Sequence, residues 1–484
     1  MLLNKDPWFK KDTKFENRVL LNEYRPWKIR EEGKIMQVQT ENQSLIEKDK
    51  EHLWHSMSRF NPNGNPTIAV QGEGSWFSDM NGKRYLDGVS GLWCLNLGHG
   101  RKEIAQAAYE QMLNLSYFPL TLSHVPAIEL SSKLSQLLKG SYTTYFSNSG
   151  SEANEVAFKI AKQYHVQNGN PGKYKFISRY RAYHGSTMGA LSATAQANRK
   201  ERYGTSASGF LHVPPPYSYR STFENDLAAA EYMKEVINWE GADTVAGVIV
   251  EPIISGGGVL IPSKAYLTRV AEICKEHDVL LIVDEVVSGF GRTGEMFGFM
   301  HSEGVQPDII TMAKGLTSGY MPLGATAVQS YIYEKFKEAG DKQHFRHVST
   351  FGGHPAACAV ALKNIEIIEN EKIVERVSEL GSSILGELRN LENLDCVGEV
   401  RGVGFLYGIE LVANKETKEP AAEALSGKII VACKEQGLII GRNGDTIPGY
   451  QNVLILAPPL SSTVEDLRFL VDTVSVVIKE YDQK

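Results

Sequence analysis

The sequence predicts an α/β fold whose core is a mostly parallel, doubly wound sheet. From about His99 to Ser330, segments with apolar residues at helical spacing alternate with short apolar runs that are typical of buried strands. Charged side chains directly follow several of these runs, and ligands of such sheets bind outside the carboxyl ends of the strands. A chain of 484 residues also has room for a second, interlocked domain.

Before this alternation begins, the chain predicts a small layer made of one helix and one hairpin. Gln43 to Trp54 has the charges and spacing of an amphipathic helix, and a loop rich in Pro, Asn and Gly follows it. Thr67 to Asp87 alternates in polarity and turns at Asn81-Gly82, a strong hairpin signal. For residues 1–35 two interpretations stay open: an extension before a native start at Met36, or a segment that packs on the body.

The stretch KGSYTTYFSNSGSEANE, which begins at Lys139, predicts a strand, a turn of small residues and a helix. The first turn of a helix has free backbone amides and the positive end of the helix dipole, so it attracts anions. Gly150 and Ser151 would therefore hold a phosphate group. An ordinary helix cap formed by Ser149 or Ser151 with Glu152 is the alternative, and the stretch by itself favours that alternative.

Two acidic residues, Asp284 and Glu285, end the apolar run VLLIV. Because ligands bind at the carboxyl ends of such strands, we expect both acids to face a site. They could hold the magnesium ion of an ATPase, pair with a protonated cofactor ring, or cap the following turn. An ATPase requires the phosphate loop GxxxxGK followed by Ser or Thr, and no Gly-Lys pair of this sequence meets that pattern. The ATPase interpretation is therefore set aside.

Lys314 follows another apolar run, Ile309 to Met312, and its neighbours in KGLTSG have little side-chain bulk. Most lysines are solvated surface charges, but this position would present an amine to a cleft. A lysine and Asp284 at two strand ends are what a pyridoxal phosphate enzyme needs. The lysine forms a Schiff base with the cofactor, and the carboxylate keeps the ring nitrogen protonated.

Five sequence motifs support this interpretation and carry a family resemblance. They are, in order along the chain, SNSGSEAN, YHGSTMGALS, DEVVSGFGRTG, AKGLTSGYMPLGA and STFGGHPAACA. From about Leu53 to the C-terminus the sequence resembles the class III pyridoxal-phosphate aminotransferases of fold type I, most closely the omega, or amine:pyruvate, transaminases. The resemblance implies a large domain with the sheet and a small α/β domain formed by both chain ends. Its expected parts are an N-terminal extension at 1–35, small-domain residues at 36–90, the large cofactor-binding domain at 91–350 and further small-domain residues at 351–484.

The resemblance implies the cofactor pyridoxal 5'-phosphate and assigns it to residues from all five motifs. Lys314 and Asp284 are the expected catalytic residues. The resemblance implies that Tyr183 and Val286 lie on opposite faces of the cofactor ring and that His184 supports the site. Without the motifs, Tyr183 is more simply explained as an aromatic that packs in a turn, and His184 as a structural histidine. The expected cofactor contacts are Ser149, Gly150, Ser151, Tyr183, His184, Glu251, Asp284, Val286, Lys314 and Thr350.

Thr350 matches a threonine that members of the family lend to the cofactor phosphate of the neighbouring subunit, which implies a homodimer with shared active sites; a plain turn residue is the alternative.

Glu251 follows the run VAGVIV and places another carboxylate at a strand end. Many relatives have a Gln three residues later that reaches the hydroxyl of the cofactor ring. This sequence has Ile254 there, so the partner of the hydroxyl is not predicted.

Trp93, Tyr183 and Arg442 are the substrate-binding residues that the resemblance implies. Trp93 lies in GLWC, and the tryptophan of that motif lines the substrate pocket of the omega transaminases; a core aromatic is the alternative. Arg442, in GLIIGRNGD, corresponds to an arginine that swings in to bind a substrate carboxylate and swings out for an uncharged amine. A bidentate guanidinium suits that task. Without the family, a surface salt bridge is the favoured interpretation of Arg442.

The predicted activity is the transfer of an amino group from an amine or omega-amino acid to a keto acid such as pyruvate, in two half-reactions, with Lys314 moving the proton. The nearest alternative is adenosylmethionine-8-amino-7-oxononanoate aminotransferase of biotin synthesis, or another class III aminotransferase, because HLWHSM faintly resembles a segment of that enzyme. GLWC and TFGGHP look more like the amine:pyruvate branch. Outside the family, a serine hydrolase or a non-catalytic binding protein is disfavoured, and neither a GxSxG elbow nor an HExxH metal pair occurs.

The composition argues against several classes of partner. With 51 basic and 57 acidic residues the net charge is -6, which does not fit a nucleic-acid or anionic-membrane partner. The five cysteines form no CxxC pair, so neither a disulfide framework nor a zinc site is predicted. No apolar run approaches the roughly 18 residues that span a bilayer. We therefore expect a cytoplasmic enzyme of small molecules that has no metal site.

Overall fold

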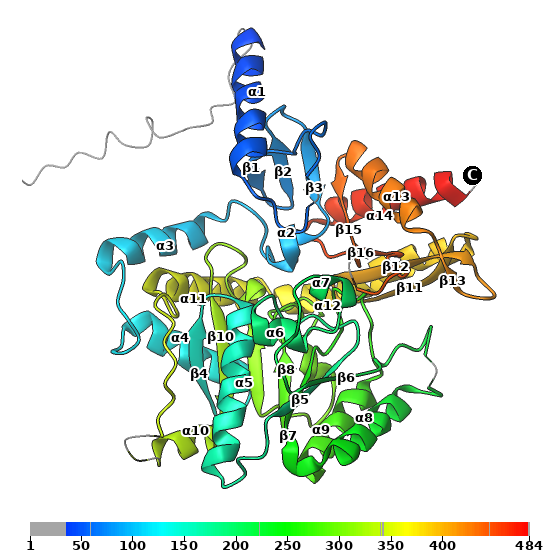
Figure 1. Ribbon diagram of the computed structural model, residues 1–484. Coiled ribbons are helices and arrows are strands. Elements are labelled where there is room, and N and C mark those ends of the chain that lie inside the picture. The colour runs from blue at the N-terminus through cyan, green and yellow to red at the C-terminus, as the bar shows by residue number, and fades with distance from the viewer. Residues whose placement is uncertain are drawn as a thin grey trace, which may run out of the picture. The chain divides into compact units, whose positions relative to one another are not determined.

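The computed structural model (Figure 1) describes residues 35–482 except for six positions, namely Arg59, Thr222, Ala339, Asp341, Lys342 and Asp445. The chain divides into two units. The smaller unit holds the described residues up to Val70 together with Ser78–Lys83, and the larger unit holds Gln71–Phe77 and the residues from Arg84 onward. The predicted extension at 1–35 lies outside the described residues except for Ile35. The predicted boundaries at 36–90, 91–350 and 351–484 stay predictions.

The smaller unit contains the predicted helix and the predicted turn. Helix α1 (Ile35–His52) begins before the expected start of the amphipathic segment and ends two residues before its expected end at Trp54. The turn at Asn81-Gly82 is confirmed, because the Gly82 amide donates to the Asp79 carbonyl at 2.9 Å. Gly82 has a φ of 82°, a conformation that favours glycine.

A seven-stranded sheet of order β4-β10-β9-β8-β7-β5-β6 forms the centre of the larger unit (Figure 1). Among these strands, β10 is antiparallel to both neighbours and the others run parallel, so the predicted mostly parallel sheet is confirmed. The strands are β4 (Tyr142–Ser147), β5 (Lys175–Arg179), β6 (Phe210–Val213), β7 (Val245–Val250), β8 (Leu280–Asp284), β9 (Ile309–Met312) and β10 (Gly324–Gln329).

Helices cover both faces of this sheet, as a doubly wound fold requires. Consecutive residues of a strand point to opposite faces. Leu280 and Ile282 of β8 accordingly belong to one apolar cluster with residues of α5, and Leu281 and Val283 belong to a second cluster with residues of α9. The helices of this part are α2 (Ser90–Trp93), α3 (Lys102–Asn114), α4 (Val125–Leu137), α5 (Gly150–Gln167), α6 (Met188–Ala193), α7 (Ala197–Lys200), α8 (Asp226–Glu240), α9 (Lys264–Glu276), α10 (Ser330–Lys337) and α11 (Pro355–Asn370).

The two ends of the larger unit's chain meet in smaller sheets, as predicted for a small domain formed by both chain ends. Leu438 of β14 pairs in parallel register with Leu86 of β3, within a sheet of order β1-β2-β3-β14. A second sheet has the order β11-β12-β16-β15, with β13 beside β12. The strands are β1 (Ala69–Glu73), β2 (Trp76–Asp79), β3 (Arg84–Asp87), β11 (Val397–Val403), β12 (Leu406–Asn414), β13 (Glu419–Pro420), β14 (Leu438–Ile439), β15 (Gly441–Arg442) and β16 (Val453–Leu456).

The remaining helices complete this C-terminal region and the loops of the large sheet. Within the described part of the chain, no helix combines the length and the apolar character needed to cross a membrane. The long helices are α12 (Ile373–Arg389), α13 (Glu423–Glu435) and α14 (Val464–Asp482). The short 3-10 helices are η1 (Ala242–Thr244), η2 (Gly298–His301), η3 (Lys314–Leu316) and η4 (Asn390–Asn393).

Three neighbouring strands end side by side at one edge of the large sheet. The register pairs Val250 of β7 with Val283 of β8, and Asp284 of β8 with Thr311 of β9. The residues that follow these strands, Glu251 after β7 and Lys314 shortly after β9, therefore come to the same edge as Asp284.

Candidate active site

Lys314 is the first residue of η3, directly beyond β9, and has a left-handed φ of 45°. For a residue with a side chain this conformation costs about 1 kcal/mol, so the surrounding structure must hold it. The Nζ atom lies 5.3 Å from the centre of the Trp93 ring. Burial lowers the pKa of the Lys314 amine, although the carboxylates of Asp284 and Glu251 oppose the shift. The neutral amine, which is the nucleophilic form, is correspondingly more abundant.

Asp284 is buried, and its carboxyl group has three hydrogen-bond partners. Its Oδ2 atom accepts from Asn154 Nδ2 at 2.9 Å and lies 2.8 Å from His184 Nδ1. Its Oδ1 atom accepts from the Val286 amide at 3.1 Å. The other ring nitrogen of His184, Nε2, is buried without a partner among the described residues. The carboxylate is thus fixed in orientation by groups on three separate elements.

Glu285 does not face the site, and the expectation that both acids do so is wrong. Successive side chains at the end of a strand point in opposite directions, so Glu285 turns away from Asp284. Its Oε2 accepts from Ser288 Oγ at 2.6 Å and from the Gly298 amide at 2.9 Å, and its Oε1 accepts from the Phe299 amide at 2.7 Å. Burial raises the pKa of Glu285 to about 7. This residue holds a loop together behind the site.

Glu251 holds the backbone at Tyr183 and at Ser255 through hydrogen bonds. Its Oε1 accepts from the Tyr183 amide at 3.0 Å, and its Oε2 accepts from the Ser255 amide at 3.1 Å. Burial raises the pKa of the Glu251 carboxyl. The Tyr183 hydroxyl lies 2.8 Å from Ser186 Oγ, and the guanidinium carbon of Arg199 lies 4.8 Å from the centre of its ring.

The turn before α5 contains both features that the sequence leaves open. Ser149 is the helix cap, because its hydroxyl accepts from the Glu152 amide at 3.2 Å. The cap leaves the amides of Gly150 and Ser151 at the helix start, where a helix has no internal acceptors for them. A Cβ atom at Gly150 would lie 2.9 Å from Val286 Cγ2, so only glycine fits without displacement. An ordinary cap and an open anion-binding end therefore coexist.

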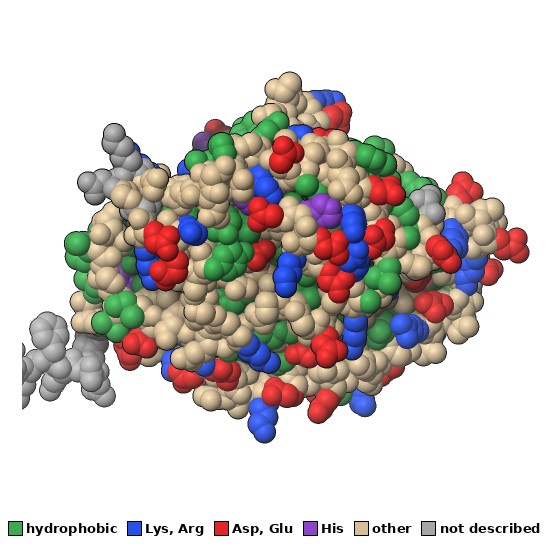
Figure 2. Space-filling view, turned by 90° about the horizontal axis from the view of Figure 1, so that it is seen from below, with side chains coloured by type: hydrophobic (Ala, Val, Ile, Leu, Met, Phe, Trp, Pro, Cys, Tyr) green, Lys and Arg blue, Asp and Glu red, His purple; other side chains and the backbone are tan. Residues whose placement is uncertain are grey.

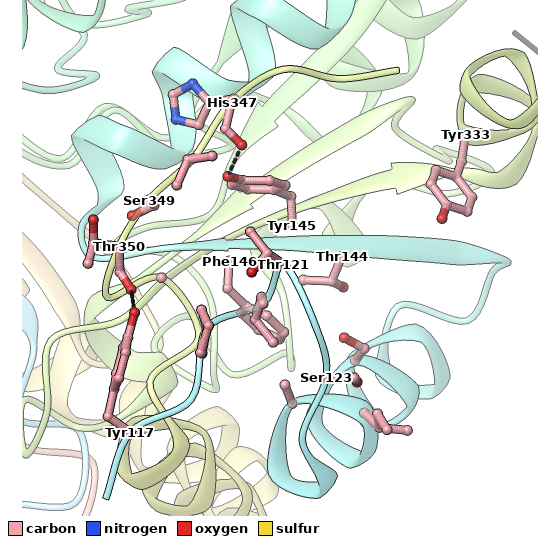
Figure 3. A pocket seen from close by; sticks show the side chains of 17 residues that line it. Tyr117, Thr121, Ser123, Thr144, Tyr145, Phe146, Tyr333, His347, Ser349 and Thr350 are labelled. Carbon is pink, nitrogen blue, oxygen red and sulfur yellow. Dashed lines mark hydrogen bonds between the residues drawn. The ribbon is translucent and has the colours of Figure 1, made fainter. Parts of the chain in front are cut away.

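Thr350 lies on an exposed segment. It lines a surface cavity of about 500 Å³ to which none of the other predicted residues contributes. Figure 3 shows this cavity between α4, β4 and the segment from His347 to Thr350. The hydroxyl of Tyr117 donates to the Thr350 carbonyl at 2.8 Å, and Asn148 Nδ2 donates to Ser349 Oγ at 2.9 Å.

Arg442 forms a partly exposed ion pair in this structure. Its Nη2 lies 2.8 Å from Glu423 Oε1, and its Nη1 lies 3.3 Å from Ser426 Oγ, both on α13. The role of Arg442 in binding a substrate carboxylate stays a prediction. Ile254 is buried in an apolar cluster with Tyr217 and Leu260, so it offers no polar atom to a ligand.

Sequence reasoning missed Asn154 and Arg199. Besides Asp284, Asn154 contacts the His184 carbonyl, to which its Nδ2 donates at 2.6 Å. The signal for Asn154 was available, because it is a polar residue on the mostly apolar buried face of α5. Arg199 gave no signal, since ANRK resembles any polar surface stretch.

The residues fit pyridoxal phosphate. Lys314 supplies an amine of lowered pKa, Asp284 an oriented negative charge, and the start of α5 an anion-binding end that Gly150 keeps free of side-chain bulk. Trp93 Nε1 is buried with no hydrogen-bond partner among the described residues, which leaves a donor for a ligand. When bound, the cofactor supplies a ring that withdraws electrons from the substrate carbon. Within the described residues no group of three His, Cys, Asp or Glu side chains could hold a metal ion.

Known proteins resemble this chain over most of its length. A family model described as aminotransferase class III matches residues 60–478. The "Uncharacterized aminotransferase YhxA" of Bacillus subtilis is 56% identical over 435 residues, which cover 90% of this chain and 96% of that protein. The taurine–pyruvate aminotransferase of Bilophila wadsworthia is 42% identical over 448 residues, which cover 91% of this chain and 98% of that protein. The crystal structure of an (S)-enantioselective omega-transaminase from Thermomicrobium roseum has a TM-score of 0.85 at 38% identity and covers 90% of this chain and 98% of that chain.

The resemblance inferred from the five motifs is therefore confirmed, and so is the cofactor that it implies. The assembled lysine, carboxylate and helix start provide the chemistry that such an enzyme requires. The chain belongs to the class III aminotransferases, which are transaminases that depend on pyridoxal phosphate.

Proposed function

We propose that the protein transfers the amino group of an amine or omega-amino acid to a keto acid such as pyruvate, in two half-reactions. The observation that carries the proposal is the Lys314 amine beside Trp93, at the strand ends that hold Asp284 and Glu251. The relative from Bilophila wadsworthia is named for taurine and pyruvate, which supports an omega-amino donor and a pyruvate acceptor. The omega-transaminase from Thermomicrobium roseum supports amines as donors.

Each residue of the site has a definite task in this proposal. Lys314 would hold the cofactor, and its Nζ would carry the proton that leaves the substrate carbon bearing the amine. Asp284 would lie beside the ring nitrogen and favour its protonated form, and the negative charge of a carboxylate is most effective in a buried site. Asn154 and His184 hold that carboxylate in one orientation. Trp93 and Tyr183 exclude water and shape the space for the donor.

A panel of donors and acceptors tests the proposal. The holoenzyme is incubated with pyruvate and, in turn, 1-phenylethylamine, β-alanine, taurine or S-adenosylmethionine, and alanine formation is measured. We expect alanine from one or more of the first three donors and none from S-adenosylmethionine. If only S-adenosylmethionine donates, and only to a keto acid other than pyruvate, the biotin-synthesis alternative replaces this proposal.

We further propose that the enzyme is a homodimer in which Thr350 serves the site of the neighbouring subunit. Large apolar side chains are exposed around the cavity of Figure 3, including Leu122, Val348 and Phe351 at 66%, 74% and 60% exposure. The rings of Tyr117 and Phe351 lie 5.9 Å apart, and Val348 lines the same cavity as Tyr117. Apolar patches of this kind usually mark an interface between proteins.

Complementation between two inactive variants tests the shared site. Lys314→Ala removes the amine, and Thr350→Ala removes the contact to the partner's cofactor phosphate. Mixing the two under conditions that exchange subunits creates dimers with one intact site. We expect activity to return to about a quarter of the wild-type level, since half of the dimers are mixed. Mixed dimers that stay inactive, or a fully active Thr350→Ala protein, would refute the shared site.

A cytoplasmic location is also proposed, from the chemistry of the cysteines. All five carry free thiols, as is usual in a reducing compartment. Burial raises the pKa of Cys358 and of Cys433 to about 12, so these two thiols are unreactive at neutral pH.

A further inference from the structure

A second cavity, of about 260 Å³, lies where β5 and β6 end. Tyr180 and Arg181 follow β5, and Pro214 and Pro215 follow β6, at the sheet edge where ligands of such folds bind. Residues from the segment 217–223 and from the loop between β15 and β16 complete the lining. None of the described residues that line it is a predicted contact of the cofactor or of the substrate. The cavity is therefore a place of its own.

Arg181 is a buried cation at this cavity, with an exposed fraction of only 3%. Its guanidinium carbon lies 5.0 Å from the centre of the Tyr217 ring and 5.4 Å from the centre of the Tyr450 ring. Its Nη1 atom is buried with no hydrogen-bond partner among the described residues, and no carboxylate of those residues pairs with the guanidinium. Arginine keeps its charge in proteins, and a buried charge without a partner is costly. The two rings offset only part of that cost.

The other charges of this cluster are already matched. Glu410 pairs with two arginines, because Arg220 Nε lies 2.5 Å from its Oε1 and Arg401 Nη1 lies 2.7 Å from its Oε2. Arg401 Nη1 also lies 2.5 Å from Glu399 Oε2. These two arginines and two glutamates balance, so the positive charge of Arg181 is in excess among the described residues of the cluster.

Arg181 and Arg220 bring hydrogen-bond donors to the same cavity. Both residues line it, and both guanidinium carbons lie 5.4 Å from the centre of the Tyr450 ring. Arg220 Nη2, like Arg181 Nη1, is buried with no hydrogen-bond partner in the described part of the chain. Guanidinium N–H groups suit the oxygen atoms of a carboxylate.

The size and the remaining lining of the cavity limit what it can hold. A volume of about 260 Å³ lies just below the roughly 300–1,000 Å³ that is usual for pockets of drug-sized ligands. The ligand is therefore small. The lining also includes apolar side chains, among them Pro214, Pro215, Phe223 and Ile447, which suit an apolar body rather than a second charged group.

We propose that this cavity binds a small organic carboxylate whose charged group is joined to a flat apolar body. The carboxylate accepts from Arg181 and Arg220 and neutralises the excess charge of Arg181. A flat body can stack on the aromatic rings of the lining. Because Arg181 stands two residues before Tyr183, the bound anion adjoins the segment that leads into the active site. The site is additional to that of the cofactor and does not depend on the proposed function.

Titration calorimetry of the holoenzyme with benzoate tests the proposal. We expect a dissociation constant of about 1 mM or tighter. Arg181→Gln should weaken binding at least about tenfold, because a hydrogen bond from a charged donor is lost. Benzamide, which has nearly the same shape and no charge, should also bind at least about tenfold more weakly than benzoate. Arg202→Gln is the matched control: it removes the same charge from a side chain that is 89% exposed, and should leave the affinity unchanged.

A variant that fills the cavity tests the same site without removing an arginine. Ile447→Trp places a larger side chain in the lining and should weaken benzoate binding at least about tenfold. A wild-type enzyme that does not bind benzoate in the millimolar range overturns the proposal, and so does an unchanged affinity in Arg181→Gln. If Arg181→Gln fails to fold, wild-type affinity in Ile447→Trp overturns the proposal by itself.

A crystal soaked with 4-bromobenzoate locates the anion directly. The anomalous signal of bromine should lie in the cavity beside Tyr450. Bromine that is found only beside Trp93, or nowhere in the enzyme, would show that the cavity does not take such an anion. None of these measurements uses turnover, so they judge this cavity whether or not any donor of the panel reacts.

Discussion

At the scale of single residues, the direction in which a side chain points decides which groups it contacts. Asp284 and Glu285 are adjacent in the chain, but side chains alternate along a strand. The Asp284 carboxyl group therefore bonds Asn154, whereas the Glu285 carboxyl group bonds the Phe299 amide on the other side. The same rule separates Gly441 from Arg442. Asn154 shows the complementary effect, since its place on α5 lets one amide fix the Asp284 carboxylate.

We propose Lys314 as the residue on which turnover depends. We expect Lys314→Ala to lower kcat by about a thousandfold or more, because it removes both the nucleophile and the proton carrier. Alanine formation measures the effect, and borohydride reduction followed by peptide mapping shows which residue holds the cofactor. Lys337→Ala is the matched control, since Lys337 is a surface residue paired with Glu334 at 2.7 Å. A Lys314→Ala enzyme of near wild-type rate would contradict the assignment.

Glu285 makes stability depend on pH. Its pKa is raised to about 7 in the folded protein, above the ordinary value of 4.5, so the fold favours the protonated form. This contribution is therefore complete below about pH 4.5 and is lost as the pH rises toward 7, with a total on the order of 3 kcal/mol. Denaturant unfolding at pH 5 and pH 8 should show a smaller decrease for Glu285→Gln than for the wild type. Equal decreases in the two proteins would show that Glu285 does not titrate in this range.

At the scale of elements, the site is a meeting of strand ends with one helix start. β7, β8 and β9 end in register and bring Glu251, Asp284 and Lys314 to one edge of the sheet. α5 contributes its N-terminus, whose cap uses Ser149 and leaves the neighbouring amides available. The parallel direction of these strands is essential, because an antiparallel partner would carry its end to the opposite edge.

Gly150, at the start of α5, lies against Val286, which follows strand β8. We expect Gly150→Ala to weaken cofactor binding at least about tenfold and to destabilise the fold by about 1–3 kcal/mol, because its Cβ would lie 2.9 Å from Val286. Spectroscopic titration with pyridoxal phosphate and thermal melting measure the two effects. Gly386→Ala, in α12, is the control: its Cβ would meet nothing within 4 Å, and it should stabilise the protein slightly. Unchanged cofactor affinity in Gly150→Ala would argue against a phosphate at the start of α5.

At the scale of the whole molecule, the surface distinguishes two kinds of region. On the face shown in Figure 2, acidic and basic side chains are interspersed, in line with a net charge of only -6 over 484 residues. A mixed surface of this kind has no large field of a single sign. The exposed apolar patch around Val348 and Phe351 differs in character and is the surface that we assign to the dimer.

Charges introduced into that patch should separate the subunits. We expect the double variant Val348→Asp with Phe351→Asp to sediment as a monomer and to lose at least about tenfold in activity, because two carboxylates would have to be buried without partners. Val431→Asp, a change at a 56% exposed position on α13, should sediment like the wild type. A double variant that still sediments as a dimer would place the interface elsewhere.

Much of the fold could be predicted because it depends on local patterns. The β9 boundaries at Ile309 and Met312 and the turn at Gly82 follow from apolar runs and from turn chemistry. Lys314, Asp284 and the start of α5 were predicted for the same reason, since each directly adjoins such an element. Arg199 could not be, because the polar stretch ANRK does not show what it will contact.

The sequence by itself determined which elements form and which chemical groups stand at their ends, because hydrophobic periodicity and glycine positions act over a few residues. Only the tertiary structure decided which of those groups meet. Glu285 bonds the Phe299 amide, Arg442 pairs with Glu423, and Arg199 stacks on Tyr183. These pairings join separate segments of the chain, and their direction depends on how strands and helices pack.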